Sequence, residues 1–154
     1  MPTKPARPRR CTLAVPGSSE KMMAKAAALS VDQVFLDLED AVAIGAKESA
    51  RGLAIKALTD LSWQARTLSV RINDVSTRWC HDDIIELVTH AGARLDTIIL
   101  TKAKSSSDVR FVHLLLEQLE RKLGLTKRIG IECLIEEVEG LMPVSYTHLR
   151  AHET

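Results

Sequence analysis

The chain has 154 residues, of which 45% are hydrophobic and 27% charged, and its 21 basic and 20 acidic residues give a formal net charge of +1. These fractions exclude wholesale disorder and a collagen-like chain, and the near-neutral charge gives no electrostatic reason to expect nucleic acid as a partner. No run approaches the roughly 18 apolar residues of a membrane helix, and no apolar stretch follows the basic start, so no secretory signal is expected.

Residues 1–10 carry three prolines and four basic residues and are predicted to form a flexible basic arm. After this arm, short apolar runs alternate with segments whose apolar residues recur at helical spacing. Strands are predicted at 12–16, 33–39, 67–72, 97–102 and 128–136, and helices at about 20–29, 46–61, 77–91 and 105–123.

The predicted strands begin roughly 20 to 35 residues apart, which is the spacing of βα units. They are nearly continuous apolar runs, as expected in a parallel sheet. Such a repeat builds either a doubly wound sheet or a TIM barrel. No Gly-x-Gly-x-x-Gly follows the first strand, and polar residues gather at strand ends, where TIM-barrel enzymes place their active sites. The favoured fold class is α/β: about five βα units forming the N-terminal part of a TIM (β/α)8 barrel.

The second predicted strand ends in an acidic cluster, Asp37, Glu39 and Asp40. Alternation along an extended segment would place Asp37 and Glu39 on one face. The cluster is either a solvated start of a loop or an acidic pocket that binds a metal ion or water.

Two cationic residues stand at the ends of the next strands. Arg71 follows a buried run, so it is expected to pair with a carboxylate of the protein or with an anionic substrate. Lys102 could form a Schiff base, but a simpler role is as partner of the acidic cluster. Lys102 is also predicted to bind substrate.

The fifth predicted strand contains Glu132 and Glu136, which share a face if the strand is regular. Glu136, at the strand end, is the expected site residue, whereas Glu132, deeper in the strand, is expected to be ion-paired inside the barrel mouth. Glu137 and Glu139 are expected in the first turn of a following helix.

The three cysteines, Cys11, Cys80 and Cys133, are far apart and odd in number. They form neither a disulfide framework nor the close pairs of a zinc site, so a cytoplasmic location is expected. Cys80 is adjacent to His81 at a predicted helix start, where neighbouring side chains diverge, so no Cys–His nucleophile is expected.

The last twelve residues, PVSYTHLRAHET, break the pattern and hold the only tyrosine. They resemble the translation of a transposon-end sequencing adapter. Residues 143–154 are therefore expected to be an artefact tail, to be excluded from fold reasoning. The expected domain is a partial TIM-barrel domain over residues 11–142, truncated after the fifth strand.

The residues described so far resemble the HpcH/HpaI aldolase–citrate lyase β-subunit family, and most of all its malyl-CoA, β-methylmalyl-CoA and citramalyl-CoA lyases. The resemblance runs from about Arg10 to Met142. Its motifs, in the family's order, are LAVPGSSEKM from Leu13, VFLDLEDAV from Val34, VRIN from Val70 and RIGIECLIE from Arg128.

The resemblance implies a Mg²⁺-dependent TIM-barrel enzyme that cleaves or forms a carbon–carbon bond beside a thioester. By this resemblance Arg71 holds the substrate and stabilises the thioester enolate, and Glu136 is the first of two carboxylates that bind Mg²⁺ and substrate. Glu39 and Asp40 match the acidic pair that orders water at the metal. Thr101 stands where a proline is usual, and the second metal-binding aspartate and the acid/base segment are expected beyond residue 142.

The expected function is cleavage of malyl-CoA, or of a methylmalyl or citramalyl relative, to acetyl- or propionyl-CoA and glyoxylate or pyruvate. The parent protein is expected to be a homo-oligomer with an acyl-CoA substrate and with neither nucleic acid nor a membrane as partner. Two alternatives stay open: a citrate lyase β subunit, which acts on an acyl-carrier-protein thioester, and a catalytically silent fragment or non-enzymatic homologue.

Overall fold

The computed structural model describes residues 9–141 of the chain. The predicted artefact tail lies outside these residues, as does the predicted arm except for its last two members. Those two are held by carboxylates of the fold. Arg10 Nε lies 3.1 Å from Asp32 Oδ2, and Arg9 Nη1 lies 2.8 Å from Glu132 Oε1.

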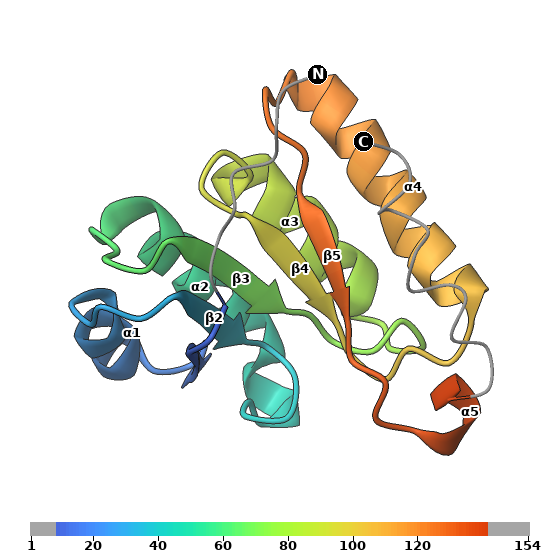
Figure 1. The fold of residues 1–154 in the computed structure, drawn as a ribbon, viewed down its shortest axis with the longest axis horizontal. Helices are drawn as coiled ribbons and strands as arrows, with labels where there is room; N and C mark the ends of the chain where they lie inside the picture. The colour runs from blue at the N-terminus through green and yellow to red at the C-terminus, as the bar shows by residue number, and fades with distance from the viewer. Residues whose placement is uncertain (1–8, 142–154) are drawn as a thin grey trace.

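Five parallel strands form one sheet in the order in which they occur along the chain (Figure 1). They are β1 (Thr12–Pro16), β2 (Gln33–Asp37), β3 (Thr67–Arg71), β4 (Thr97–Leu100) and β5 (Gly130–Cys133). A doubly wound sheet reverses its strand order at a switch point, whereas a barrel adds each strand beside the previous one. The observed order is that of a barrel.

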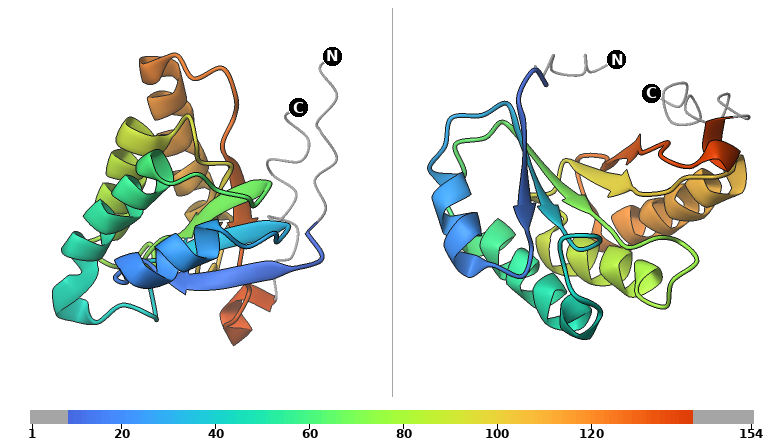
Figure 2. Two further views of the ribbon diagram at one scale, coloured as in Figure 1. Left: turned by 90° about the vertical axis from the view of Figure 1, so that its left-hand side faces the viewer. Right: turned by 90° about the horizontal axis from the view of Figure 1, so that it is seen from below.

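Helices cover one face of the sheet (Figure 2). They are α1 (Glu20–Ala27), α2 (Lys47–Asp60) with the 3₁₀ turn η1 (Ile44–Ala46) before it, α3 (Cys80–Ala91) and α4 (Ser106–Leu123), and the short α5 (Val138–Leu141) follows β5. Helix α4 has a side-chain cap at its start and a glycine at its end. Ser105 and Asp108 form a capping box at the start of α4, and Gly124 ends it with a left-handed φ of 62°.

Helix α3 begins at Cys80, three residues later than predicted. The preceding residues form a turn instead, because Asp74 Oδ1 accepts hydrogen bonds from the backbone and hydroxyl of Ser76. The hydroxyl of Thr77 donates to the carbonyl of Asp74 at 2.6 Å. Local side-chain bonds of this kind compete with helix formation.

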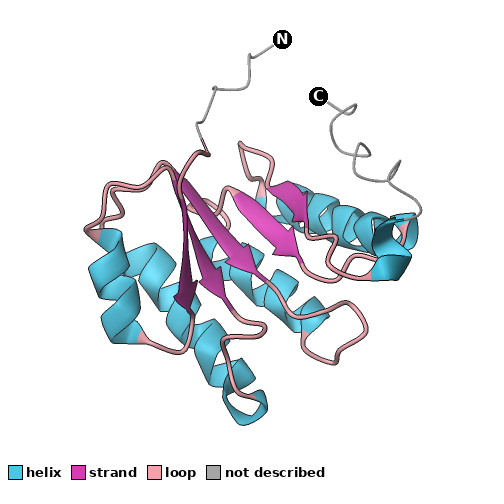
Figure 3. Cartoon of the chain, turned by 60° about the horizontal axis from the view of Figure 1, so that its bottom comes forward, coloured by secondary structure: helices cyan, strands magenta, loops and turns pink. Residues whose placement is uncertain are grey.

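The hydrophobic core lies between the sheet and the helices. Its largest fully buried side chains come from both layers and from their connections: Met23, Leu36, Leu38, Leu58, Ile72, Ile84, Leu87, Leu95, Ile98, Leu100 and Leu116. Since this core holds the strands in register, it fixes where their carboxyl ends lie, and these ends meet at one edge of the sheet (Figure 3).

Glu132 is ion-paired, as expected, but its partner is Arg9 and its side chain is 27% exposed, so the pair is not buried inside the barrel mouth. Glu132 belongs to a polar group near the starts of the strands. Its carboxylate accepts hydrogen bonds from Gln33 Nε2 at 3.0 Å and Thr97 Oγ1 at 2.6 Å. The prediction that one regular strand contains both Glu132 and Glu136 is wrong. Strand β5 ends at Cys133, so Glu136 lies in the following loop.

No helix within residues 9–141 is long and apolar enough to cross a membrane.

Candidate functional site

The carboxyl edge of the sheet brings the predicted site residues together. Asp37 ends β2, Arg71 ends β3, and the others lie in the loops that follow β2, β4 and β5. Together they form the cluster called here the carboxylate edge: Asp37, Glu39, Asp40, Arg71, Lys102 and Glu136.

Arg71 is held by Asp37, its neighbour in the register of the parallel strands β2 and β3. Nε of Arg71 donates to Asp37 Oδ1 at 2.9 Å and Nη2 donates to Oδ2 at 2.5 Å. The pKa of Arg71 is raised, mainly by these hydrogen bonds. Of the two partners predicted for Arg71, the structure therefore provides the protein carboxylate. A guanidinium has five donors, and two of them are committed to Asp37.

Asp37 also stabilises the loop that follows β2. Besides Arg71, its carboxylate accepts the backbone N–H of Glu39 at 2.8 Å and that of Ala41 at 3.1 Å. Four donors fill the carboxylate of a buried aspartate. Asp37 therefore shapes the loop after β2 and orients Arg71.

Glu39 and Asp40 both lie beside Lys102. The ammonium of Lys102 is 2.6 Å from Glu39 Oε1 and 3.6 Å from Asp40 Oδ1. The pKa of Lys102 is raised, mainly by its hydrogen bond to Glu39. The pKa of Asp40 is lowered by hydrogen bonding to Glu39 and, less strongly, by the charges of Lys102 and Arg71. Glu39 is buried and Asp40 exposed, so Asp40 presents the accessible carboxylate of the pair.

Glu136 reaches the same cluster from the loop after β5. Its Oε1 accepts hydrogen bonds from Thr101 Oγ1 at 2.6 Å and from the backbone N–H of Lys102 at 3.1 Å. Lys102 thus contacts Glu39 through its side chain and Glu136 through its backbone. It joins the two acidic parts of the carboxylate edge.

Lys47 is a member of this site that the sequence analysis missed. It is the first residue of α2, is only 7% exposed, and donates from Nζ to the carbonyls of Leu38 at 2.9 Å and Glu39 at 2.6 Å. Burial lowers its pKa. A positive charge in the first helical turn opposes the helix dipole, which was the only signal in the sequence that this lysine has a special role.

A buried ion pair supports the segment after β3, and it was also missed. Asp83 on α3 accepts from Arg51 Nε on α2 at 2.8 Å, and from the backbone and side-chain nitrogens of Asn73 at 3.0 and 2.7 Å. Asn73 follows Arg71 by two residues. The pair therefore fixes the backbone just beyond Arg71. Both charged residues lie at helical spacing from buried apolar positions, which is the signal that could have identified them.

The donor set suits Mg²⁺ in the way proteins commonly bind it, through one or two carboxylates with water completing the shell. Glu136 would be a direct ligand, because its Oε2 takes no hydrogen bond or ion pair in the described part of the chain. Three or more His, Cys, Asp or Glu side chains arranged to enclose a metal ion are not found among residues 9–141. Oxygen ligands and the lack of thiolate or imidazole favour Mg²⁺ over zinc.

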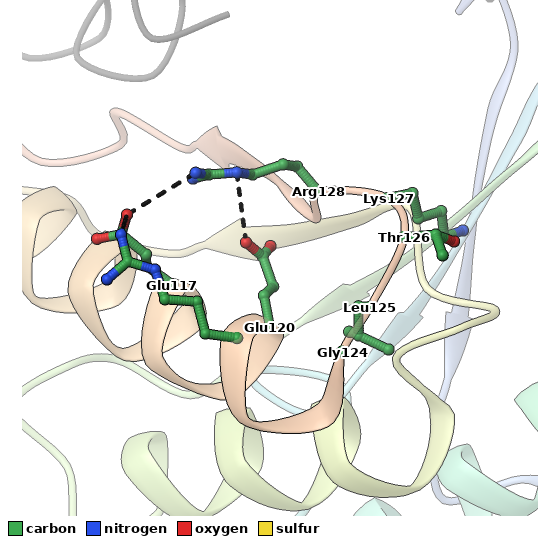
Figure 4. Close-up of a pocket in the computed structure, with 8 residues that line it drawn as sticks. Glu117, Glu120, Gly124, Leu125, Thr126, Lys127 and Arg128 are labelled. Atoms are coloured by element: carbon green, nitrogen blue, oxygen red, sulfur yellow. Dashed lines mark hydrogen bonds and ion pairs between the residues drawn. The ribbon is translucent and has the colours of Figure 1, made fainter.

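The carboxylate edge is distinct from a surface hollow of about 400 Å³ at the opposite end of the sheet (Figure 4). The hollow lies where α4 ends and the chain enters β5, and its charged lining is already paired. Arg128 lies 3.8 Å from both Glu117 and Glu120. Because it is remote from the strand carboxyl ends, the hollow is not a candidate for the catalytic centre.

Cys80 is buried and Cys133 is partly buried, and neither is suited to act as a nucleophile. Burial raises the pKa of Cys80 to about 12 and that of Cys133 to about 11. Since the thiolate is the reactive form, both thiols are inert near neutral pH. The expectation that Cys80 and His81 form no catalytic pair agrees with this.

Comparison with known proteins gives a family match and close relatives. The family model described as HpcH/HpaI aldolase/citrate lyase matches residues 10–146. An L-malyl-CoA/β-methylmalyl-CoA lyase of Cereibacter sphaeroides is 41% identical over 143 residues, which are 93% of this chain and 45% of that lyase. The chain thus spans less than half the length of this relative.

Solved structures agree with the fold. A citrate lyase of Burkholderia xenovorans matches with a TM-score of 0.79 at 24% identity, over 88% of this chain and 43% of that one. A citrate lyase β subunit of M. tuberculosis, complexed with oxaloacetate and magnesium, matches with a TM-score of 0.64 at 28% identity, over 90% of this chain and 52% of that one. These proteins have a TIM-barrel-like fold, so the predicted fold class is confirmed.

Proposed function

Because the chain belongs to the HpcH/HpaI aldolase/citrate lyase family, we propose that its whole protein is a Mg²⁺-dependent carbon–carbon lyase acting on a β-hydroxyacyl-CoA. The family resemblance drawn from the sequence motifs is confirmed by the match over residues 10–146. The proposed substrate is malyl-CoA or a methylmalyl or citramalyl relative, by analogy with the Cereibacter sphaeroides lyase. The products are acetyl- or propionyl-CoA and glyoxylate or pyruvate.

The observation that best supports this proposal is the convergence of Arg71, the Glu39–Asp40 pair and Glu136 at one edge of the sheet. When the bond between the two carbons breaks, the hydroxyl proton leaves and the electron pair passes to the acyl-CoA half as an enolate. The other half becomes an α-keto acid. Such a reaction needs a cation or hydrogen-bond donor at the thioester oxygen and a Lewis acid at the keto acid.

Arg71 is the proposed stabiliser of the enolate. Two of its donors are committed to Asp37, which holds the guanidinium plane in one orientation, and Nη1 lies 3.6 Å from Glu39 Oε2 and 3.8 Å from Asp40 Oδ2. A donor that is already oriented before the charge develops lowers the barrier most effectively. Asp37 is therefore a positioning residue for Arg71.

Glu136 is the proposed ligand that holds Mg²⁺, and Glu39 and Asp40 the proposed residues that order water beside it. When bound, Mg²⁺ would polarise the carbonyl of the keto acid. The four carboxylates of the carboxylate edge lie near three cationic side chains: Arg71 and Lys102 pair with them directly, and Lys47 binds the backbone carbonyl of Glu39. The resulting surplus of negative charge favours a divalent cation accompanied by an anionic substrate.

The test is an assay of the full-length gene product with malyl-CoA, with and without Mg²⁺. We expect formation of acetyl-CoA and glyoxylate that stops on addition of EDTA and returns with Mg²⁺. A folded full-length product that turns over none of malyl-, methylmalyl- or citramalyl-CoA would contradict the proposal. We further expect no turnover by the 154-residue chain alone, since it corresponds to under half of the related lyase.

A citrate lyase β subunit is the second candidate, and the M. tuberculosis match favours it. The two candidates differ in the carrier of the thioester. Cleavage of citryl-acyl-carrier protein in preference to the CoA esters would decide for the second candidate.

The proposed domain covers residues 11–142, with 143–154 as an adapter-derived tail and 1–10 as a basic arm. Resequencing the source gene across codon 142 tests the tail, because a genuine reading frame would continue with codons that align to the lyases.

We propose a homo-oligomer in the cytoplasm. The free thiols of Cys11, Cys80 and Cys133 support a reducing compartment. Size-exclusion chromatography with light scattering measures the oligomeric state.

A further inference from the structure

We propose that Thr101 and Lys102 are positioning residues that select Oε2 of Glu136 as the metal-binding oxygen. This inference rests on the proposed function, since it assigns a role to residues around the proposed Mg²⁺ ligand. Neither residue needs to contact the metal or the substrate. Each acts through Glu136.

The geometry gives the two carboxylate oxygens of Glu136 different surroundings. Oε1 takes both available donors, the hydroxyl of Thr101 at 2.6 Å and the backbone N–H of Lys102 at 3.1 Å. Oε2 takes no hydrogen bond or ion pair from the rest of the described chain, and the Glu136 residue is exposed. A carboxylate held at one oxygen in this way presents the other oxygen as a single, oriented ligand.

The end of β4 is rigid enough to impose this orientation. Thr101 is fully buried. The loops after β4 and β5 are tied by two backbone hydrogen bonds, from Leu134 N to Leu100 O at 2.9 Å and from Ala103 N to Leu134 O at 3.1 Å. The position of Thr101 is therefore fixed relative to the segment that carries Glu136.

Lys102 has an unusual backbone conformation that serves the same end. Its φ of 49° makes it the only residue other than glycine with a positive φ among residues 9–141. A lysine in this left-handed region is strained, and such strain persists where surrounding contacts determine it. Here the contacts are the backbone bond to Glu136 and the side-chain ion pair with Glu39. Lys102 therefore fixes the position of Glu39 relative to Glu136.

The test is the Mg²⁺ affinity of the full-length gene product, measured by titration calorimetry on metal-free protein. Thr101→Val keeps the shape of the side chain and removes its hydroxyl donor. We expect the Kd for Mg²⁺ to rise about tenfold, the lower end of the range for outer-shell substitutions. Thr101→Ser restores the donor and is expected to return the Kd to within about threefold of the wild-type value.

Thr77→Val is the matched control. It removes a hydroxyl hydrogen bond of the same 2.6 Å length in the loop after β3, where the acceptor is the carbonyl of Asp74 and not Glu136. We expect its Kd for Mg²⁺ to match that of the wild type. Thermal unfolding of all four proteins separates a folding defect from an effect on the ligand.

The outcomes distinguish this inference from the proposed function. Wild-type protein that binds no Mg²⁺ would contradict the proposed function and, with it, the inference. Wild-type protein that binds Mg²⁺ while Thr101→Val binds it equally well would overturn the inference alone. A serine variant that fails to restore affinity would do the same, because a purely structural role of the threonine side chain would then explain the loss.

Discussion

Asp37 and Arg71 lie side by side at the carboxyl ends of β2 and β3 and share two hydrogen bonds, of 2.9 and 2.5 Å. The pairing is a direct consequence of strand register, because the two residues are Cα partners in the parallel ladder. It is also the reason why arginine suits this position. A planar guanidinium can bind a carboxylate through two donors and still present others, whereas an ammonium cannot hold one orientation.

Arg71→Lys is therefore expected to lower kcat/KM of the full-length lyase by about a hundredfold or more, the size of effect seen when an oxyanion donor is lost. The charge is kept, so Mg²⁺ affinity should change little. Steady-state kinetics with malyl-CoA provide the measurement, with Arg66→Lys in the loop before β3 as control. A lysine variant with wild-type kinetics would show that charge alone is needed at position 71.

Lys102→Met is expected to lower kcat by roughly tenfold to a hundredfold, as for other substitutions around metal ligands. It removes the 2.6 Å contact that fixes Glu39 Oε1 but keeps the backbone bond to Glu136. Lys104→Met is the matched control, since Lys104 lies two residues away and pairs with Glu137 instead. Equal rates for the two variants would argue against a role for the Lys102 ammonium.

The architecture could be predicted from the sequence because each element has its own local signal. Strands β1 to β5 are nearly continuous apolar runs, and the capping box at Ser105 and the glycine at 124 mark both ends of α4. Strand order followed because consecutive βα units add neighbouring strands. Once the order is known, Asp37, Arg71 and the residues after β4 and β5 must meet at one edge.

The remaining parts of the site depend on contacts between segments, which local sequence patterns mark weakly or not at all. Lys47 binds two backbone carbonyls, and a carbonyl has no sequence signature. The position of Glu136 could not be derived from strand alternation, because β5 ends three residues before it. The split of its oxygens between held and free depends on donors 34 and 35 residues away in the chain.

Lys47→Met is expected to lower the free energy of unfolding of the full-length protein by about 1–3 kcal/mol, the cost of leaving buried polar groups without partners. The carbonyls of Leu38 and Glu39 would each lose a donor. Chemical denaturation measures the change, with Lys25→Met at an exposed site on α1 as control. An unchanged midpoint would mean that water satisfies both carbonyls.

Asp83→Ala is expected to be more damaging, by about 3–5 kcal/mol, because it leaves the buried guanidinium of Arg51 without its main partner. The side chains of Arg51 and Asp83 are 5% and 0% exposed. The exposed pair of Lys56 and Glu20 provides the comparison, and Lys56→Ala should change stability by less than about 1 kcal/mol. Similar losses in both variants would contradict the burial argument.

The buried thiol of Cys80 makes stability depend on pH in the alkaline range. Its pKa rises from 9.0 to about 12 because burial disfavours the thiolate. The unfolded chain releases this proton above about pH 9 whereas the folded chain keeps it, so deprotonation favours the unfolded state. The contribution is complete below pH 9 and is lost as pH rises towards 12, by up to about 1.4 kcal/mol per pH unit.

Cys80→Ala should therefore show a shallower fall of unfolding free energy between pH 9 and 11 than the wild type, even though its stability at pH 7 is lower because of the smaller side chain. The difference between the two slopes isolates Cys80, since every other titrating group is present in both proteins. Urea denaturation at several pH values measures it. Parallel curves would show that Cys80 ionises equally in the folded and unfolded states, and would place its thiol in contact with water rather than in the hydrophobic core.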